Sequence, residues 1–347
     1  ESYIIEDAAI SRRLAALLAE KRAQGVQVAV IYDAVGSFGT RQTFFDELAA
    51  AGVAVCAFNP VNPLKRLGYF DISHRDHRKI LVVDHEFAFT GGINISAVYS
   101  SGSFGRRKSG GRSEADMAGW RDTQVQLRGP AVLALDALVR ETWQQQGCEG
   151  ELRTPPPHAG PRPAGRQLMR VVPSTPDDAF NRIYALLLSS IVSAQRSVYL
   201  TMAYFAPGEE MVEALCAAAR RGVDVQLVLP SRSDFAPVLH AGRSHYERLL
   251  GAGVQIHELQ DAVLHAKTAV IDGVVSTVGS SNMDWLSFTR NNEVNAVVIG
   301  EDFGQAMTQM FERDRSASQT ISLAAWQQRS LWQRGKEALA RLFERWW

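Results

Sequence analysis

The sequence predicts an α/β protein made of two pseudo-symmetric halves, each a mostly buried mixed β-sheet flanked by helices. Three observations predict this class. Short apolar strands alternate with amphipathic helices, the same order of segments occurs twice, and a proline-rich run separates the two copies. With 347 residues, of which 46% are hydrophobic, the chain is long enough for two ordinary domains.

The internal repeat is clearest in strands that follow a glycine. Residues 25–33 (GVQVAVIYD) match residues 222–230 (GVDVQLVLP) position for position, and each copy follows a helix with apolar periodicity. A second unit of helix, glycine and strand follows in each copy, at 44–55 and at 246–256. Each copy then has two further apolar strands. Both halves are therefore predicted to have the order βαβαββ.

The boundary between the copies lies in a run rich in Pro and Gly (RTPPPHAGPRPAG), which can be neither helix nor central strand. We interpret this run as a surface linker. We expect a first half over 1–152, a linker over 153–167, a second half over 168–320 and an amphipathic C-terminal helix over 321–347.

The two copies differ at their starts. The second half opens with a helix over 180–194 that leads into a strand, whereas the first half opens directly on the end of the matching strand. We expect the natural protein to have ~40 or more further residues upstream, on the usual lengths of helices and strands.

Composition and charge favour some classes of protein over others. The chain has 37 basic and 37 acidic residues, so it lacks the basic excess of a nucleic-acid-binding protein. No apolar run reaches the ~18 residues of a transmembrane helix. The cysteines Cys56, Cys148 and Cys216 are odd in number, far apart and outside any CxxC pair. We therefore expect buried, reduced thiols in a cytosol-facing protein.

A motif of the form H-x-K-x4-D occurs once in each half. Along a strand, positions i and i+2 share a face, so each His and its Lys emerge together. The Asp completes the motif and is counted among the candidate catalytic residues, although its opposite parity suits it better to fixing structure than to contacting a substrate. An Asn follows each His by 17 residues, after small residues that allow close approach. The positions are His77, Lys79, Asp84, Gly91, Gly92 and Asn94 in the first half, and His265, Lys267, Asp272, Gly279, Ser280 and Asn282 in the second.

Two copies of this motif at matching places of a repeat are far more specific than one short match. These residues resemble the phospholipase D superfamily, whose paired HKD motifs meet between two pseudo-symmetric halves. Within it, the chain looks most like the bacterial cardiolipin synthase branch, in stretches such as YDAVGS, FTGGINIS, WRDTQVQLRGPAV and NNEVN. The stretch over 99–119, rich in Gly, Ser and Arg, departs from the expected pattern, and the transmembrane segments that often precede this domain are absent.

The residue types suit phosphodiester chemistry. Two Lys and two Asn can neutralise the phosphate as charge develops in the transition state. No cofactor is expected, and no set of Asp, Glu and His has metal-ligand spacing. One imidazole can attack phosphorus to form a phosphohistidine, while the other protonates the leaving alkoxide and deprotonates the incoming hydroxyl. The resemblance implies that His77 attacks and His265 is the acid and base, and that Asp122 and Glu293 orient the histidines.

The resemblance implies a phosphatidyltransferase that makes cardiolipin from two phosphatidylglycerols and releases glycerol. It also implies a bacterial inner-membrane location, either peripheral or through an anchor in a missing N-terminal segment. A hydrolytic phospholipase D, with water as acceptor, is the alternative. A phosphodiesterase or nuclease of the same superfamily is less favoured, because the neutral charge predicts no nucleic-acid partner. An oligomer is compatible with the sequence.

The C-terminal segment SLWQRGKEALARLFERWW has large apolar residues at helical spacing, and its basic residues outnumber its acidic ones. This pattern is typical of a helix at a membrane surface. Packing of the stripe on the protein's own core, or on a second subunit, is an equal alternative. The apolar residues are Leu331, Trp332, Leu339, Leu342, Phe343 and Trp346.

Overall fold

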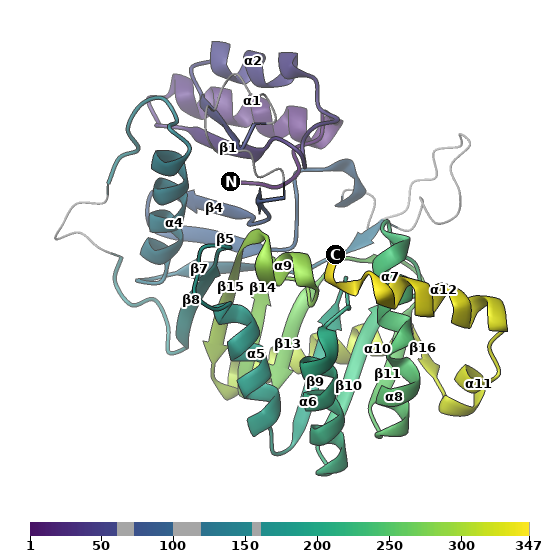
Figure 1. Cartoon of the computed structure of the whole chain (residues 1–347). Coiled ribbons are helices and arrows are strands. Elements are labelled where there is room, and N and C mark those ends of the chain that lie inside the picture. The colour runs from purple at the N-terminus through teal and green to yellow at the C-terminus, as the bar shows by residue number, and fades with distance from the viewer. Residues whose placement is uncertain (61–72, 100–118, 155–160, 347) are drawn as a thin grey trace.

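The computed structural model describes residues 1–60, 73–99, 119–154 and 161–346. It confirms the predicted class of fold: the first half, purple to blue in Figure 1, packs beside a second half, green to yellow, and both are built from sheets covered by helices. We keep the predicted residue bounds as working definitions of the two halves.

The first half opens with α1 and then follows the predicted alternation of helices and strands, with isolated bridges at Ser2 and Ile5 in place of the expected first strand and with β3 as an additional strand. Strands β1 and β2 pair in parallel, and β4, β5 and β7 form an antiparallel sheet. The elements are α1 (Ala9–Ala23), β1 (Ala29–Asp33), α2 (Gln42–Ala50), β2 (Ala54–Phe58), β3 (Arg75–Asp76), β4 (Ile80–Val83), β5 (Phe87–Gly91), η1 (Ala97–Tyr99), β6 (Trp120–Arg121), β7 (Gln124–Arg128) and α4 (Val132–Gln145).

The second half contains the same pattern with additional elements at both ends. Its elements are β8 (Leu168–Ser174), α5 (Arg182–Ser193), β9 (Ser197–Met202), α6 (Gly208–Arg220), β10 (Asp224–Pro230), α7 (Ala236–Ser244), α8 (Tyr246–Gly251), β11 (Gln255–Leu259), β12 (Val263–Leu264), β13 (Lys267–Ile271), β14 (Val275–Gly279), α9 (Trp285–Thr289), β15 (Asn291–Ile299), α10 (Glu301–Ser316) and β16 (Ser318–Ile321). The chain ends in α11 (Leu323–Gln327), α12 (Leu331–Leu342) and η2 (Glu344–Trp346).

Two short strand pairs join the halves. Among the described residues, the principal sheet has the strand order β16-β11-β10-β9-β13-β14-β15-β3, with β8 also paired to β15. Its last strand, β3, belongs to the first half and pairs in parallel with the start of β15. In the other direction, β6 of the first half pairs in parallel with β12 of the second. The residues that follow β3 and β6 are thereby held against the other half.

Apolar periodicity explains how the helices cover the sheet. In α6, Met211, Leu215 and Ala218 recur at helical spacing and are fully buried against the strands. A separate core cluster contains residues of both halves, including Leu127 and Leu135 from the first and Val294 from the second. Burial of such side chains is the main favourable term in folding. The interface that carries the site is therefore a packed apolar contact.

The motif aspartates lie in the turns of two equivalent hairpins. Asp84 and His85 have φ values of 54° and 57° between β4 and β5, and Asp272 and Gly273 have φ values of 54° and 70° between β13 and β14. In each hairpin these two residues with positive φ form the centre of a tight turn, which is closed by a backbone hydrogen bond from Glu86 to Val83 or from Val274 to Ile271. Asp tolerates this conformation better than most residues. The Asp of each motif thus closes the hairpin.

The expectation of three reduced thiols is wrong. Cys56 of β2 and Cys148, which follows α4, form a disulfide with their Cα atoms 5.6 Å apart, whereas Cys216 is free and buried. The two cysteines are 92 residues apart in the chain, and only the return of α4 to β2 brings them together. Because disulfides persist in oxidising compartments, the inference of a cytosol-facing protein from reduced thiols no longer stands.

In the described ranges, no helix combines the length and apolar character needed to cross a bilayer.

We predict that Cys148→Ser, or reduction of the wild-type protein, lowers the free energy of unfolding by about 2–5 kcal/mol, because the disulfide closes a long loop in the unfolded chain. Urea denaturation with and without reductant measures this, and reductant should change the stability of Cys148→Ser little. Alkylation of the unfolded, unreduced protein should label one thiol. Three labelled thiols would contradict the disulfide.

Candidate active site

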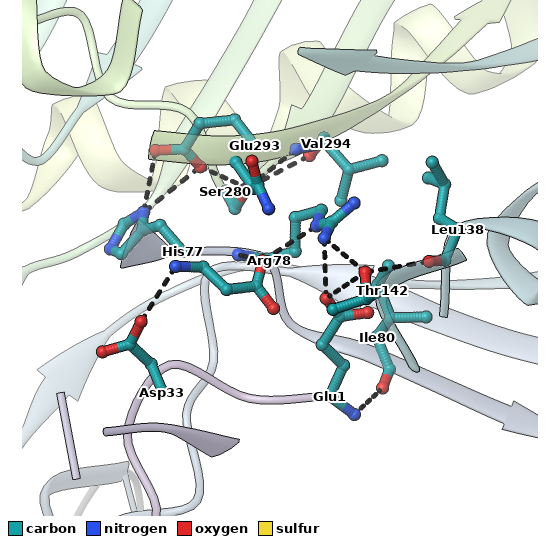
Figure 2. Close-up of polar contacts among 12 residues, drawn as sticks. Glu1, Asp33, His77, Arg78, Ile80, Leu138, Thr142, Ser280, Glu293 and Val294 are labelled. Carbon is teal, nitrogen blue, oxygen red and sulfur yellow. Dashed lines mark hydrogen bonds and ion pairs between the residues drawn. The ribbon is translucent and has the colours of Figure 1, made fainter. Parts of the chain in front are cut away.

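The histidine of the first half contacts a carboxylate of the second. His77 directly follows β3, and its backbone N–H donates to the carbonyl of Asn292 at 3.0 Å. Its imidazole Nδ1 lies 3.0 Å from Oε1 of Glu293 on β15, and the hydroxyl of Ser280 donates to the same carboxylate (Figure 2). The side chains of His77 and Glu293 are buried. The carboxylate therefore holds the imidazole in one orientation.

The histidine of the second half contacts a carboxylate of the first. His265 follows β12, and its backbone N–H donates to the carbonyl of Arg121 at 2.8 Å. Its Nδ1 lies 2.7 Å from Oδ2 of Asp122 and 3.1 Å from the hydroxyl oxygen of Tyr99. A Cβ atom on Gly92 would lie 2.1 Å from Oδ1 of Asp122, so a glycine is needed here.

The acid–histidine pairs are thus exchanged between the halves. The family resemblance assigns Glu293 and Asp122 the role of orienting the histidines. Their positions in the chain do not show which histidine each one contacts. The strand pairs β3–β15 and β6–β12 decide this. In both pairs the carboxylate engages Nδ1, which favours the tautomer with its proton on Nδ1 and leaves Nε2 bare. Nε2 is the nitrogen that can react.

The two motif lysines are buried beside the histidines. Lys79 Nζ donates to the carbonyl of His77 at 2.5 Å, and Lys267 Nζ donates to the carbonyl of His265 and lies 3.0 Å from its Nδ1. Burial lowers the pKa of Lys79 to about 7, against the opposing charge of Glu293. It likewise lowers the pKa of Lys267 to about 8. Both lysines are therefore close to losing their charge near neutral pH.

Burial and the lysines also set the protonation of the other groups. Burial and then Lys267 lower the pKa of His265 to about 4, and burial lowers that of His77 although Glu293 opposes it. Burial alone would raise the pKa values of Glu293 and Asp122, but the histidine and lysine charges outweigh it and lower both. At neutral pH both carboxylates are ionised and both imidazoles are neutral.

Within the described ranges, no group of three or more His, Cys, Asp or Glu side chains could hold a metal ion. The positive charge beside the two histidines comes from the lysines.

Both motif asparagines are buried, and one of them is connected to a histidine. Asn94 is buried, accepts a hydrogen bond from the backbone N–H of Ile4 at 3.1 Å and donates to the hydroxyl of Tyr99 at 3.4 Å. Asn94 is thereby connected through Tyr99 to His265. Asn282 is buried as well, and its Oδ1 has no hydrogen-bond partner among the described residues. Each half thus contains one buried motif amide.

The motif aspartates do not join the site. Asp84 and Asp272 lie in the hairpin turns, at the ends of β4 and β13 far from the histidines, and at about 3.3 Å per residue a strand of this length keeps the groups well apart. Asp84 is exposed, while the Asp272 carboxylate accepts hydrogen bonds from the backbone N–H groups of residues 195–197. This corrects their place among the candidate catalytic residues: they shape the scaffold.

Aromatic residues that the motif did not indicate surround the histidines. The ring of Tyr3 lies 4.9 Å from that of His77, with Lys79 Nζ 5.3 Å from the Tyr3 centroid. The rings of Trp120 and Tyr204 lie 4.9 and 6.5 Å from that of His265. The repeat contained a signal for the two tyrosines. The strand ends SYII in the first half and AYF in the second are equivalent, and residues at equivalent strand ends should flank the same site.

His74 adds a further bond between the halves, with its Nε2 2.8 Å from Oδ1 of Asn292.

A duplicated α/β fold with exchanged His–carboxylate pairs and a buried Lys beside each His defines a member of the phospholipase D superfamily. The family model described as "Cardiolipin synthase, PLD-like domain" matches residues 2–102 and 187–315. The chain belongs to this family.

The chain is similar to curated cardiolipin synthases over nearly its whole length. That of Geobacillus kaustophilus (strain HTA426) is 36% identical over 347 residues, which cover 99% of this chain and 66% of that protein. Cardiolipin synthase 2 of Bacillus anthracis is 35% identical, with 99% of this chain and 64% of that protein covered. The chain thus spans slightly less than two thirds of the length of these relatives.

A solved structure supports the fold. Phosphatidylserine synthase of Haemophilus influenzae Rd KW20 aligns with 99% of this chain and 87% of its own length, at a TM-score of 0.65 and 10% sequence identity. At this identity the likeness concerns the fold alone.

We predict that kcat/KM for a soluble aryl phosphodiester falls as the pH rises above about 7–8. Lys79 and Lys267 lose their positive charge as the pH passes their pKa values of about 7 and about 8, and a neutral lysine no longer attracts the phosphate. Initial rates at low substrate concentration between about pH 6 and 9.5 test this, since kcat/KM reports the free enzyme. A flat profile would show that the lysines keep their charge.

Proposed function

We propose that this protein is a phosphatidyltransferase that makes cardiolipin from two phosphatidylglycerol molecules through a covalent phosphohistidine and releases glycerol. The observation that carries the proposal is the exchanged pairing of His77 with Glu293 and of His265 with Asp122, at 3.0 and 2.7 Å. It leaves two reactive Nε2 atoms beside two lysines. Membership of the cardiolipin synthase family supports the choice of substrate.

In the first step, Nε2 of His77 attacks the phosphorus of one phosphatidylglycerol. The bond from phosphorus to the glycerol oxygen breaks, and the glycerol leaves with a proton from His265. His265 is neutral in the free protein and must first gain this proton. The negative phosphate offsets the charge of Lys267, which otherwise lowers the pKa of His265, and so favours protonation in the complex.

In the second step, the terminal hydroxyl of another phosphatidylglycerol gives its proton to His265, and its oxygen attacks phosphorus. The bond between phosphorus and His77 breaks, which restores the imidazole and yields cardiolipin. Lys79, Lys267 and the amides of Asn94 and Asn282 stabilise the charge on the phosphate oxygens during both steps.

A hydrolytic phospholipase D would use the same residues with water in the second step. The products distinguish the two reactions, because water gives phosphatidic acid and phosphatidylglycerol gives cardiolipin.

We predict that the purified protein, given phosphatidylglycerol vesicles without added metal, releases glycerol and forms cardiolipin. His77→Ala and His265→Ala should each lower turnover at least ~10²–10⁴-fold, because each removes a proton-transfer group or the nucleophile. Mass spectrometry of the lipids measures both results. Phosphatidic acid as the sole product would identify a phospholipase. Near-normal turnover in either variant would contradict the mechanism.

We further propose that α12 binds the surface of a bacterial inner membrane. The helix packs on α7 with its polar side, where Glu337 and Ala340 are buried and Glu337 pairs with Arg329 at 2.9 Å. Its apolar side faces away from the protein: Leu331, Trp332 and Leu342 are 83%, 75% and 78% exposed. The apolar stripe therefore does not pack on the protein's own core.

The energetic terms favour an apolar mode of binding. Each large apolar side chain that enters a membrane contributes about 1.5–3 kcal/mol as an upper bound, and each basic side chain near an anionic surface adds about 1 kcal/mol. With six exposed large apolar residues on α12 and η2, the apolar term dominates. Binding should therefore depend only weakly on salt.

We predict that Trp332→Glu combined with Leu339→Glu reduces sedimentation with phosphatidylglycerol vesicles about tenfold or more, because two charges would have to enter the membrane. The matched control is Ile10→Glu combined with Leu17→Glu, which makes the same change at exposed positions of α1. The control should bind as the wild type does. Equal binding of all three proteins would show that α12 is not the membrane contact.

A further inference from the structure

The repeat pairs each residue beside the site with an equivalent one in the other half. The backbone N–H of Ile95, which follows Asn94, donates to the carbonyl of Ile4 at 3.1 Å. The backbone N–H of Met283, which follows Asn282, donates to the carbonyl of Tyr204 at 3.1 Å. Ile4 and Tyr204 are therefore equivalent positions.

A second pair of equivalent positions follows from the strand alignment. Counting on from the ends of β1 and β10 brings Ser37-Phe38 opposite Asp234-Phe235 in the repeat. Ser37 is therefore the counterpart of Asp234. Its hydroxyl is bound to backbone atoms, accepting from the N–H of Ile5 at 3.0 Å and donating to the carbonyl of Tyr3 at 3.2 Å.

The second half instead has a polar pair that breaks the symmetry. The hydroxyl of Tyr204 donates to Oδ1 of Asp234 at 2.8 Å, and the hydroxyl of Ser233 donates to the same oxygen at 3.3 Å. The first half, with Ile4 and Ser37, has no such pair. Both hydrogen bonds go to Oδ1, and Asp234 is exposed, so the carboxylate can accept further donors.

This pair lies on the His265 side of the site. The Tyr204 ring stands perpendicular to that of His265, with centroids 6.5 Å apart. The charge of Asp234 also acts to raise the pKa of Lys267, whose net shift is downward through burial, and it acts to raise that of Tyr204. The carboxylate is thus electrostatically close to the reacting groups.

We infer that Tyr204 and Asp234 form the subsite for the alcohol that is exchanged at His265, a glycerol headgroup whose hydroxyls donate to the Asp234 carboxylate. This inference rests on the proposed transferase function. The phosphate occupies the symmetric part of the site, served by paired His, Lys and Asn residues. The alcohol needs an asymmetric part beside the acid and base. A carboxylate suits hydroxyl groups, and it repels a phosphate that enters in the wrong orientation.

The subsite can be tested by measuring how the phosphohistidine divides between its two acceptors, water and the hydroxyl of phosphatidylglycerol. Wild-type and variant proteins are given phosphatidylglycerol vesicles, and cardiolipin and phosphatidic acid are quantified in the same sample. Both products arise from one intermediate, so their ratio reports acceptor binding and does not change when a variant is only partly folded. Asp234→Asn preserves the shape and can still accept from Tyr204, but it loses the charge.

We expect the ratio of cardiolipin to phosphatidic acid to fall ~10-fold or more in Asp234→Asn, the effect of weakening hydrogen bonds to a charged group. Tyr204→Phe, which frees the carboxylate to move, should lower the ratio by a smaller factor. The matched control is Asp177→Asn, which removes one charge from an exposed loop position and should leave the ratio unchanged.

An unchanged ratio in Asp234→Asn, with a wild-type protein that makes cardiolipin, overturns the subsite and leaves the proposed function intact. A wild-type protein that makes only phosphatidic acid from phosphatidylglycerol vesicles overturns the transferase function and the subsite together.

Discussion

The burial of two carboxylates is the constraint on which the rest of the structure depends. An ionised carboxylate without exposure to water is costly unless a charged or hydrogen-bonding partner compensates it. Glu293 is fully buried and contacts His77 of the first half, while buried Asp122 contacts His265 of the second. Each half thus contains a buried carboxylate whose histidine partner lies in the other half. The packing of the two halves against each other therefore also fixes the geometry of the site.

The same burial prepares the site for an anion. Removing Lys79 and Lys267 from water brings their pKa values close to neutrality, so neither lysine holds its positive charge firmly in the protein alone. A bound phosphate reverses this balance, because its charge favours protonated lysines and a protonated His265. Interactions in such a low-dielectric site are stronger than in water. The proposed mechanism therefore couples substrate binding to proton uptake.

Pseudo-symmetry organises the molecule, and its exceptions mark specialised positions. Ser280, which donates to Glu293, corresponds to Gly92, whose missing side chain leaves room for Asp122. Tyr204 corresponds to Ile4, and the disulfide occurs in the first half only. A transfer reaction has one symmetric participant, the phosphate, and two unlike ones, the leaving and entering groups. Residues that match between the halves suit the phosphate, and residues that differ between the halves suit the leaving and entering groups.

The sequence by itself determined the repeat, the class of fold, the paired His, Lys and Asn positions and the apolar stripe of the last helix, because periodicity and motif spacing are local properties. The two acids were indicated by the family resemblance. Tertiary structure alone decided which acid contacts which histidine, that Asp84 and Asp272 form turns, that Cys56 and Cys148 are joined, and that the stripe on α12 faces outward. These features depend on contacts between residues far apart in the chain. The hydrophobic pattern predicts which face of a helix or strand is apolar. The packing of the whole fold decides whether another element covers that face or leaves it exposed.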